Sequence, residues 1–355
     1  MLQEKICNGG APCITLESCI GLYDLLQRGT NPQLTQLLRR LHCGFQATNQ
    51  PKICCPPEYQ TMPGGGNAQT TPSSKVSLLP NARECGVQQN DDRIVGGTQA
   101  DLDDHPWMTL LRYDKPRGWT FSCGGVLITS RYVLTAAHCV KGLDLPSTWT
   151  LSQVRLGEWN TSSTMDCIQG DCNAPPLDVP IERIIPHEQY DARDEHQQND
   201  IALLRLAREV QYTGTTLIHF IKPICLPLSD ELRRSSFSGW DIQVAGWGKT
   251  ETRSESDVKM KVRVPVVPIA ECREVYQRVS RHISNKQLCA GGVEGQDSCR
   301  GDSGGALMGH ASNSNNWITI GVVSYGPSPC GTKGWPGVYT RVGAYVDWIL
   351  SKLEP

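Results

Sequence analysis

The chain lacks long hydrophobic runs and an excess of charge of either sign. None of its segments approaches the roughly 20 apolar residues that a membrane-spanning helix needs, so we expect no membrane span. The 34 Lys and Arg residues balance 36 Asp and Glu, for a formal charge of −2, and this leaves no bulk basicity that would attract nucleic acid. The start, Met1-Leu2-Gln3-Glu4, has no apolar signal core, and we interpret it as a terminus from which a secretory signal is already missing.

Cysteine, in contrast, is abundant. The 355 residues include 16 cysteines, an even number that favours an oxidising, extracellular compartment. Six of them fall within the first 55 residues, a segment too short to rely on an apolar core alone. Their spacing lacks the paired Cys-x-x-Cys units typical of zinc sites, so disulfides are favoured over zinc. Six cysteines allow 15 pairings, and the spacing alone selects none of them.

A segment with little apolar periodicity follows these cysteines. Residues 56–84 contain Pro63-Gly64-Gly65-Gly66 and Thr70-Thr71-Pro72-Ser73-Ser74. Glycine, proline and small polar residues of this kind are typical of flexible linkers. We therefore expect a linker between a small N-terminal domain and a larger one.

The loop Gly301-Asp302-Ser303-Gly304-Gly305 carries the strongest chemical signal in the chain. A serine hydroxyl at its free pKa is a poor nucleophile, and it needs a base within hydrogen-bond reach and a third group that orients the base. His138 follows an apolar, strand-like run, and Asp200 opens another. Each of the three could by itself be a turn, cap or structural residue. Together, in the order His, Asp, Ser, they predict nucleophilic catalysis.

Several motifs give the chain a specific resemblance to the chymotrypsin/trypsin family of serine proteases. Besides the blocks around His138, Asp200 and Ser303, they are Ile94-Val95-Gly96-Gly97, Gly246-Trp247-Gly248, Ser324-Tyr325-Gly326 and Pro336-Gly337-Val338-Tyr339. The resemblance covers residues 94–355 and implies two six-stranded antiparallel β-barrels with the triad between them. It also implies peptide-bond hydrolysis through an acyl-enzyme, in which His138 is the general base and then the general acid, and Asp200 holds its tautomer. The N–H groups of Gly301 and Ser303 would form the oxyanion hole.

The resemblance also assigns a substrate pocket. Asp297 would lie at its floor, with Ser324, Gly326 and Gly337 around it. Because a buried carboxylate needs a cationic partner, the expected cleavage is after Arg or Lys. The chain departs from the commonest family pattern at Arg300, Ala306 and Tyr325, which puts in doubt the preference for other substrate residues and leaves the chemistry standing.

The Arg93–Ile94 bond is the expected site of activation. Asp91-Asp92-Arg93 precedes the apolar Ile94-Val95 and resembles a substrate of another protease with Arg specificity. The family resemblance implies that the Ile94 ammonium freed by cleavage pairs with Asp302, beside the nucleophile. A buried Asp302 without that partner is costly, so the intact chain is expected to be a zymogen.

The first 55 residues resemble the clip domain of arthropod extracellular proteases, and this resemblance implies a pairing of the cysteines. The pairs implied in the clip domain are Cys7–Cys54, Cys13–Cys43 and Cys19–Cys55. In the rest of the chain, Cys85–Cys225 would tether the N-terminal part after cleavage. The remaining pairs that the family implies are Cys123–Cys139, Cys272–Cys289 and Cys299–Cys330. Cys167 and Cys172 have no counterpart in the simplest digestive relatives and would form a small extra bridge.

A loop with several oxygen ligands begins at Glu158. Glu158, Asn160, Ser163 and Asp166 fall in one short stretch that resembles the calcium loop of some family members, and hard cations prefer such ligands. A solvated acidic loop is the alternative, because two acids are a weak signal. Asn160-Thr161-Ser162 is also the only glycosylation sequon, so Asn160 is a candidate for glycosylation.

We predict a mainly β protein with a clip domain at 1–55, a linker and activation segment at 56–93, and a trypsin-like protease domain at 94–355. It resembles the Easter, Grass and prophenoloxidase-activating group, which acts in proteolytic cascades of arthropod innate immunity and development. This implies a secreted zymogen with an upstream activating protease, serpin-type inhibitors and a downstream protein substrate, either a zymogen or a cytokine precursor. The alternatives are a digestive trypsin, which the clip domain and linker disfavour, and a non-catalytic cofactor that binds through its clip domain.

Overall fold

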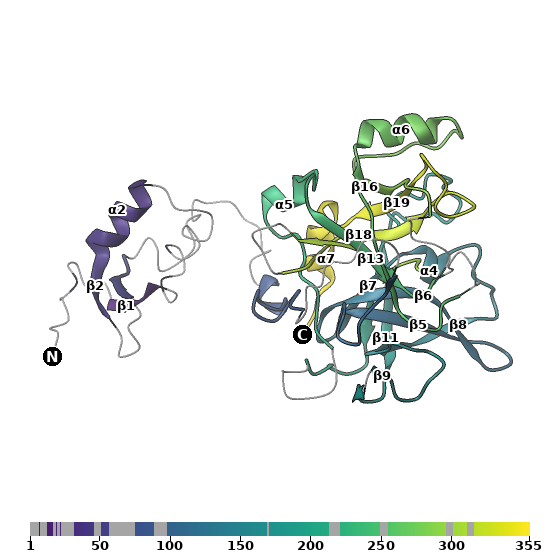
Figure 1. Cartoon of the computed structure of the whole chain (residues 1–355), viewed down its shortest axis with the longest axis horizontal. Helices are drawn as coiled ribbons and strands as arrows, with labels where there is room; N and C mark the ends of the chain where they lie inside the picture. The colour runs from purple at the N-terminus through teal and green to yellow at the C-terminus, as the bar shows by residue number, and fades with distance from the viewer. Residues whose placement is uncertain are drawn as a thin grey trace. The chain divides into compact units, whose positions relative to one another are not determined.

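The computed structural model divides into two compact units, residues 1–70 and 71–355 (Figure 1). The boundary falls inside the segment that the sequence predicts to be a linker. The structure describes residues 7, 13–16, 19, 22, 32–45, 51–56, 75–88, 98–168, 170–212, 221–248, 255–295, 301–310 and 316–355. Each unit is built around its own core.

The N-terminal unit is a three-stranded antiparallel sheet with one helix. Its strands are β1 (Cys13–Thr15), β2 (His42–Phe45) and β3 (Pro51–Cys54), in the order β1-β3-β2. The helix α2 (Pro32–Leu41) begins at a proline, whose fixed φ suits the first helical position. Among its described residues the buried apolar ones are few: Cys19, Leu22, Cys43, Ile53 and Cys55, with Ile14, Leu16, Leu37, Leu38 and Leu41 packed against the cluster of Cys19, Leu22, Ile53 and Cys55. Three disulfides close this small core: Cys7–Cys54, Cys13–Cys43 and Cys19–Cys55.

The larger unit, called the protease unit below, begins with a closed antiparallel barrel of six strands in the order β11-β12-β7-β6-β5-β8. The strands are β5 (Met108–Asp114), β6 (Trp119–Thr129), β7 (Tyr132–Thr135), β8 (Thr150–Leu156), β11 (Leu177–Pro186) and β12 (Ala202–Leu206). Closure leaves no unpaired edge, and the barrel interior is filled with Leu, Ile, Val and Tyr side chains.

The second sheet of the protease unit has eight strands in the order β15-β16-β19-β18-β17-β13-β14-β4. Its members are β4 (Thr98–Gln99), β13 (Asp241–Gly246), β14 (Met260–Arg263), β15 (Val266–Val267), β16 (Gln287–Gly291), β17 (Ala306–His310), β18 (Ile318–Tyr325) and β19 (Pro336–Arg341). The count exceeds the six strands expected because the two-residue strands β4 and β15 extend the ends of the sheet. The protein is mainly β, with two barrel-like sheets.

Short helices and hairpins complete the protease unit. The helices are η3 (Val76–Leu78), α4 (His138–Lys141), α5 (Asp230–Arg234), α6 (Ile269–Gln277), η4 (Val342–Ala344) and α7 (Val346–Lys352). The hairpin of β9 (Cys167–Ile168) and β10 (Asp171–Cys172) is closed by the Cys167–Cys172 disulfide. Figure 1 shows α6 next to β16. None of the described helices is long and apolar enough to cross a membrane.

Candidate active site

The register of two neighbouring strands brings His138 and Asp200 together. In the barrel, Thr135 at the end of β7 pairs with Ala202 at the start of β12. His138 lies three residues beyond Thr135, at the start of α4, and Asp200 lies two residues before Ala202. Antiparallel pairing therefore places both residues at the same end of the barrel.

Asp200 is fully buried, and each of its oxygens has a partner. Oδ1 accepts the backbone N–H of His138 at 2.8 Å, and Oδ2 lies 2.8 Å from His138 Nδ1. The Ser324 hydroxyl also donates to Oδ2, at 2.5 Å, and the Thr340 hydroxyl donates to the Asp200 carbonyl at 2.7 Å. These contacts fix the carboxylate, which in turn orients the imidazole so that Nε2 faces away from Asp200.

The electrostatics of this pair favour an ionised carboxylate beside a basic imidazole. Burial by itself would raise the pKa of Asp200, but the charge and hydrogen bonds of His138 and the Ser324 hydroxyl lower it below its ordinary value. Burial likewise opposes the imidazolium, but the Asp200 carboxylate raises the pKa of His138 above its ordinary value. Such a histidine accepts a proton readily, as a general base must.

The Ser303 loop is held against the barrel by glycine backbone. Gly301 and Gly304 have φ values of +99° and +77°, in the region that favours glycine. A Cβ on Gly304 would collide with Thr135 and with the Gly124 carbonyl, and one on Gly301 would come within 2.8 Å of the Gly248 Cα. The Ser303 carbonyl accepts the Gly124 N–H at 2.8 Å. The loop therefore packs on the end of β7 that leads into His138.

The described contacts of Ser303 differ from those of His138. Among the described residues, Ser303 Oγ makes no hydrogen bond with His138, and the N–H groups of Gly301 and Ser303 donate to no other group. In structures without a substrate, catalytic hydrogen bonds are often long and tighten only when a substrate binds.

Asp302 lies against the Gly246-Trp247-Gly248 motif. Its Oδ1 accepts the Gly248 N–H at 2.9 Å. A Cβ on Gly246 or Gly248 would collide with the Asp302 carboxylate, which explains why the motif needs both glycines. The expected partner of Asp302, the Ile94 ammonium, lies outside the described residues, as does Arg93.

The expected substrate pocket is described only in part. Ser324 is buried at the end of β18, and Gly337 in β19 pairs with Ala290 of β16. Gly326, just beyond β18, is exposed. Asp297 and Arg300 lie outside the described residues.

Three disulfides that the structure describes in the protease unit have the partners that the family resemblance implied. Cys123–Cys139 joins β6 to the His138 helix, Cys272–Cys289 joins α6 to β16, and Cys85–Cys225 joins the segment before the activation bond to the second sheet. Cys330 is also in a disulfide. Cys299, its expected partner, lies outside the described residues.

The candidate calcium loop contains two buried carboxylates. Glu158 and Asp166 are each 3% exposed, and both accept the Trp159 N–H, at 2.9 and 3.1 Å. Burial and the nearby Asp166 charge raise the pKa of Glu158, despite its ion pair with Arg155 at 3.2 Å. Ser163 donates its hydroxyl to Asp166, and the Asn160 carbonyl accepts the Ser163 N–H at 3.0 Å. The two carboxylates and the Asn160 carbonyl are oxygen ligands of the kind that a hard cation such as calcium takes. In this structure the carboxylates accept hydrogen bonds from Arg155, the Ser163 hydroxyl and the N–H groups of Trp159 and Asn160.

Sequence reasoning did not assign the contacts that support Asp200. Ser324 was expected near the substrate and Thr340 had no assigned role, yet both bond Asp200. They lie 124 and 140 residues away in the chain, and neither sits at a spacing that suggests contact. Only the family motif around Ser324 hinted at a role for that segment.

The site thus contains a buried aspartate hydrogen-bonded to a histidine, next to a serine loop that contains several glycines. The comparisons with known proteins agree with this geometry. Residues 94–349 match the trypsin family, and residues 10–55 match the regulatory clip domain of proteinases. The chain belongs to the trypsin family of serine proteases and carries a clip domain; it is a hydrolase of peptide bonds.

Several known proteins are similar to this chain over nearly its whole length. A Bombyx mori protein, described as CLIP domain-containing serine protease HP8, is 63% identical over 348 residues, covering 98% of this chain and 93% of that protein. The Drosophila melanogaster serine protease ea is 47% identical and covers 97% of this chain and 88% of that protein. The crystal structure of the Drosophila Grass clip serine protease of the Toll pathway superposes with a TM-score of 0.67 at 36% identity, covering 96% of this chain and 93% of that one.

Proposed function

We propose that the chain is the secreted zymogen of an endopeptidase that cleaves after Arg or Lys and acts in an extracellular proteolytic cascade. The observation that carries this proposal is the buried Asp200, bonded to His138 at the end of β7 on which the Ser303 loop packs. Base, orienting carboxylate and nucleophile loop thus converge on one end of the barrel.

In this mechanism Ser303 Oγ attacks the substrate carbonyl while His138 Nε2 takes its proton. Asp200 remains ionised and stabilises the imidazolium, in line with its lowered pKa. The N–H groups of Gly301 and Ser303 stabilise the oxyanion, and His138 then gives the proton to the leaving amine. Water attacks the acyl-enzyme by the same route and releases Ser303.

The specificity proposal rests on Asp297. Its carboxylate at the floor of the pocket would bind the guanidinium or ammonium of the substrate, with Ser324, Gly326 and Gly337 as the surroundings. To test it, fluorogenic peptides ending in Arg, Lys, Leu and Phe are compared on the cleaved enzyme and on Asp297→Ser. The Arg and Lys peptides should be strongly preferred, and the preference should disappear in the variant. An undiminished preference in Asp297→Ser would place the selective group elsewhere.

The activation proposal joins Arg93, Ile94 and Asp302. Cleavage after Arg93 would create an ammonium at Ile94 that pairs with the Asp302 carboxylate, so that the Ser303 loop adopts its active form. The Cys85–Cys225 disulfide would keep the N-terminal part attached after cleavage. Gels run with and without reductant should then differ, with two fragments only after reduction.

For the loop of Glu158, Asn160, Ser163 and Asp166 we propose a structural calcium ion. The two buried carboxylates and the carbonyl oxygen of Asn160 would hold it, and its charge would offset their repulsion. Asn160 would at the same time remain a candidate for N-glycosylation through its side-chain amide.

The cascade role is supported by the relatives. They include proteins described as melanization protease 1, Spaetzle-processing enzyme and phenoloxidase-activating factor 3. By analogy we propose an upstream activating protease, a downstream zymogen or cytokine precursor as substrate, and control by serpin-type inhibitors. An intact triad and activation sequence favour this role over that of a non-catalytic cofactor, and hydrolysis of a fluorogenic Arg peptide by the cleaved chain decides between the two.

A further inference from the structure

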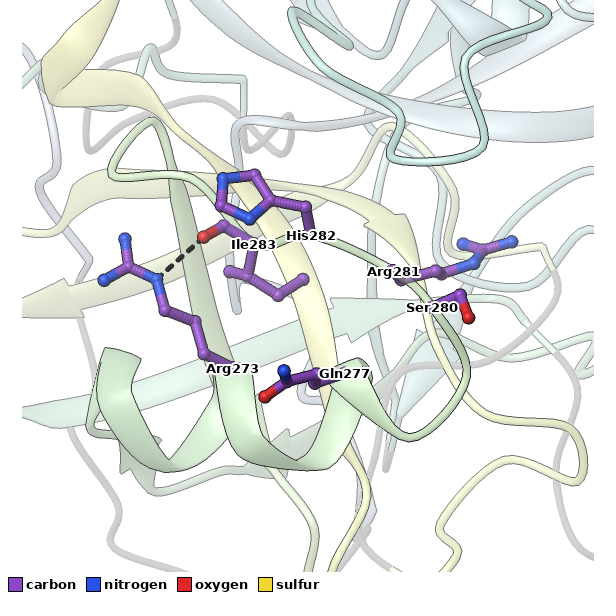
Figure 2. Close-up of a pocket in the computed structure, with 6 residues that line it drawn as sticks. All are labelled: Arg273, Gln277, Ser280, Arg281, His282 and Ile283. Carbon is purple, nitrogen blue, oxygen red and sulfur yellow. Dashed lines mark hydrogen bonds between the residues drawn. The ribbon is translucent and has the colours of Figure 1, made fainter.

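A cationic hollow of about 330 Å³ lies between the C-terminal half of α6 and the loop that follows it. It is lined by Arg273, Gln277, Ser280, Arg281, His282 and Ile283 (Figure 2). Figure 2 shows Arg273 directed to one side of Ile283 and Arg281 to the other. The two arginines have different surroundings.

Arg273 supports the loop that follows α6. Its Nε donates to the Ile283 carbonyl at 2.8 Å, and its Nη2 donates to Asn285 at 2.8 Å. The Arg281 N–H donates to the Tyr276 carbonyl at 3.0 Å, and the His282 N–H donates to His196 Nδ1 at 3.2 Å. The backbone around Arg281 is therefore held from both sides.

The Arg281 guanidinium lies 4.5 Å from the centroid of the Tyr325 ring. The Tyr325 ring itself packs edge-on against Tyr276, with centroids 5.7 Å apart. Among the described residues, no carboxylate lies within ion-pair distance of Arg281. Asp194, an acid of the loop that leads to Asp200, instead accepts the N–H groups of His196 and Gln198, both at 3.0 Å. A half-buried guanidinium is thus oriented by an aromatic ring and left without a described anionic partner.

Tyr325 connects this cation to the catalytic residues. It directly follows Ser324, whose hydroxyl donates to Asp200. Val323 still exchanges backbone hydrogen bonds with Gly304 and Gly305, which precede β17. Beyond Val323, β18 has no strand partner on that side among the described residues, while Tyr325 pairs with Val338 of β19 on its other side. An extended substrate can add to this edge of β18 as a further strand, which brings the residues before its cleaved bond past Tyr325 and Arg281.

The chain contains a segment with complementary charge. Asp91 and Asp92 come immediately before Arg93, the residue after which the proposed activation cut falls. The nearest described residues on either side are held on the protease unit: Gln88 donates to Asp104 at 2.5 Å, and Thr98 pairs with Lys261 of β14. Residues 88 and 98, on either side of Asp91-Asp92-Arg93, are thus held on their own molecule. We therefore expect the bond after Arg93 to enter the active site of another molecule more readily than its own.

We propose that Arg281, oriented by Tyr325, is a specificity residue that favours acidic side chains just before the cleaved arginine, and that its occupant is the Asp91-Asp92-Arg93 segment of a second copy of this chain. Activated molecules then cleave intact ones, so that activation amplifies itself. The proposal rests on the proposed function, since it needs cleavage after Arg93 to activate the enzyme.

The first experiment measures the charge preference. The chain is activated with immobilised trypsin, and kcat/KM is measured for a peptide spanning residues 88–97 and for the same peptide with Asp91→Asn and Asp92→Asn. We expect the acidic peptide to be cleaved about fivefold faster at low salt, with the ratio shrinking at high salt because the pair is partly exposed to solvent.

Two matched variants test whether Arg281 causes the preference for the acidic peptide. In Arg281→Gln the two peptides should be cleaved at similar rates, whereas Arg278→Gln, an exposed arginine outside the hollow, should keep the preference. Equal rates with the unaltered enzyme, or a preference that survives Arg281→Gln, overturn the proposal. If the cleaved enzyme hydrolyses neither peptide nor any other Arg substrate, the proposed function itself fails, and the present proposal fails with it.

The second experiment tests the occupant with the full chain. Intact Ser303→Ala protein, which cannot cleave itself, is mixed with a trace of trypsin-free activated enzyme, and cleavage after Arg93 is followed on reducing gels and by N-terminal sequencing. We expect a new terminus at Ile94, formed about fivefold more slowly when Asp91 and Asp92 are asparagine. If the Ser303→Ala chain stays intact under conditions in which the acidic peptide is consumed, the second copy is not the occupant.

Discussion

The base and the nucleophile of the candidate active site are positioned by different means. His138 and Asp200 come from the closed barrel, where the pairing of β7 with β12 and hydrogen bonds from Ser324 and Thr340 hold them in the uncleaved chain. Ser303 comes from a loop of the second sheet that depends on glycine backbone and on Asp302. The barrel side is set by folding, whereas we propose that the loop side is completed only by cleavage after Arg93.

The largest loss of activity is expected when the nucleophile is removed. Ser303→Ala in the cleaved enzyme should lower kcat by about 10⁶, because only binding and oxyanion stabilisation remain. Turnover of a fluorogenic Arg peptide measures the loss, and Ser238→Ala, an exposed serine outside the site, is the matched control. Activity within tenfold of the unaltered enzyme would show that Ser303 is not the nucleophile.

A smaller loss is expected when the base side is altered. Asp200→Asn should lower kcat by about 10⁴ near neutral pH, because the amide no longer stabilises the imidazolium and favours the wrong tautomer. The same assay applies. A variant with Asp178→Asn, an acid of the barrel that pairs with Arg155 away from His138, should lose far less.

The activation bond tests whether the two sides really differ. Arg93→Gln should stay uncleaved and keep activity about 10²–10⁴-fold below that of the cleaved enzyme. The ion pair between the Ile94 ammonium and Asp302 cannot form in this variant, and the loss of such a pair costs about 3–5 kcal/mol. Binding of a covalent serine-directed probe and Arg peptide hydrolysis are measured on the same sample. If Arg93→Gln is fully active without cleavage, the nucleophile side is as complete before cleavage as the base side.

The pH dependence reports on the base side alone. Because the Asp200 carboxylate raises the pKa of His138, the imidazolium is favoured in the folded protein and its stabilising effect is lost as pH rises through that raised value. The neutral imidazole, which is the general base, forms over the same pH range. In a plot against pH, kcat/KM should therefore rise with a midpoint above 6.5. In Asp200→Asn the midpoint should move to lower pH. A midpoint below 6.5 in the unaltered enzyme would contradict the assigned pairing.

The smallest effect concerns stability rather than catalysis. If calcium binds at Glu158 and Asp166, a free calcium concentration about 100-fold above the Kd should stabilise the protein by about 2.7 kcal/mol. This stabilisation should raise the Tm by roughly 5–10 °C. Chelator should reverse the shift, Glu158→Gln should abolish it, and Glu209→Gln, an exposed acid, should keep it. Melting curves that chelator does not change would favour the solvated acidic loop.

The mainly β architecture was predictable because its signals are local. Apolar runs before His138 and after Asp200 correspond to β7 and β12, and the order of His, Asp and Ser along the chain indicated the chemistry. The short strands β4 and β15 were not predictable, since two residues carry no periodicity and pair only because the second sheet offers an edge. The helix α2 starts at Pro32, because the fixed φ of proline suits the first helical position.

By itself, the sequence determined which reactive groups are present and in what order: a nucleophile between glycines, a base, an acid, and 16 cysteines. The tertiary structure alone decided which groups meet, because contacts such as Ser324 with Asp200 or Arg281 with Tyr325 depend on strand register and loop packing across more than 40 residues. It also decided that Glu158 and Asp166, which the sequence already placed in one short stretch, are both buried. Burial and neighbouring charges shift the pKa values of Asp200 and Glu158, and these surroundings arise only when the chain packs.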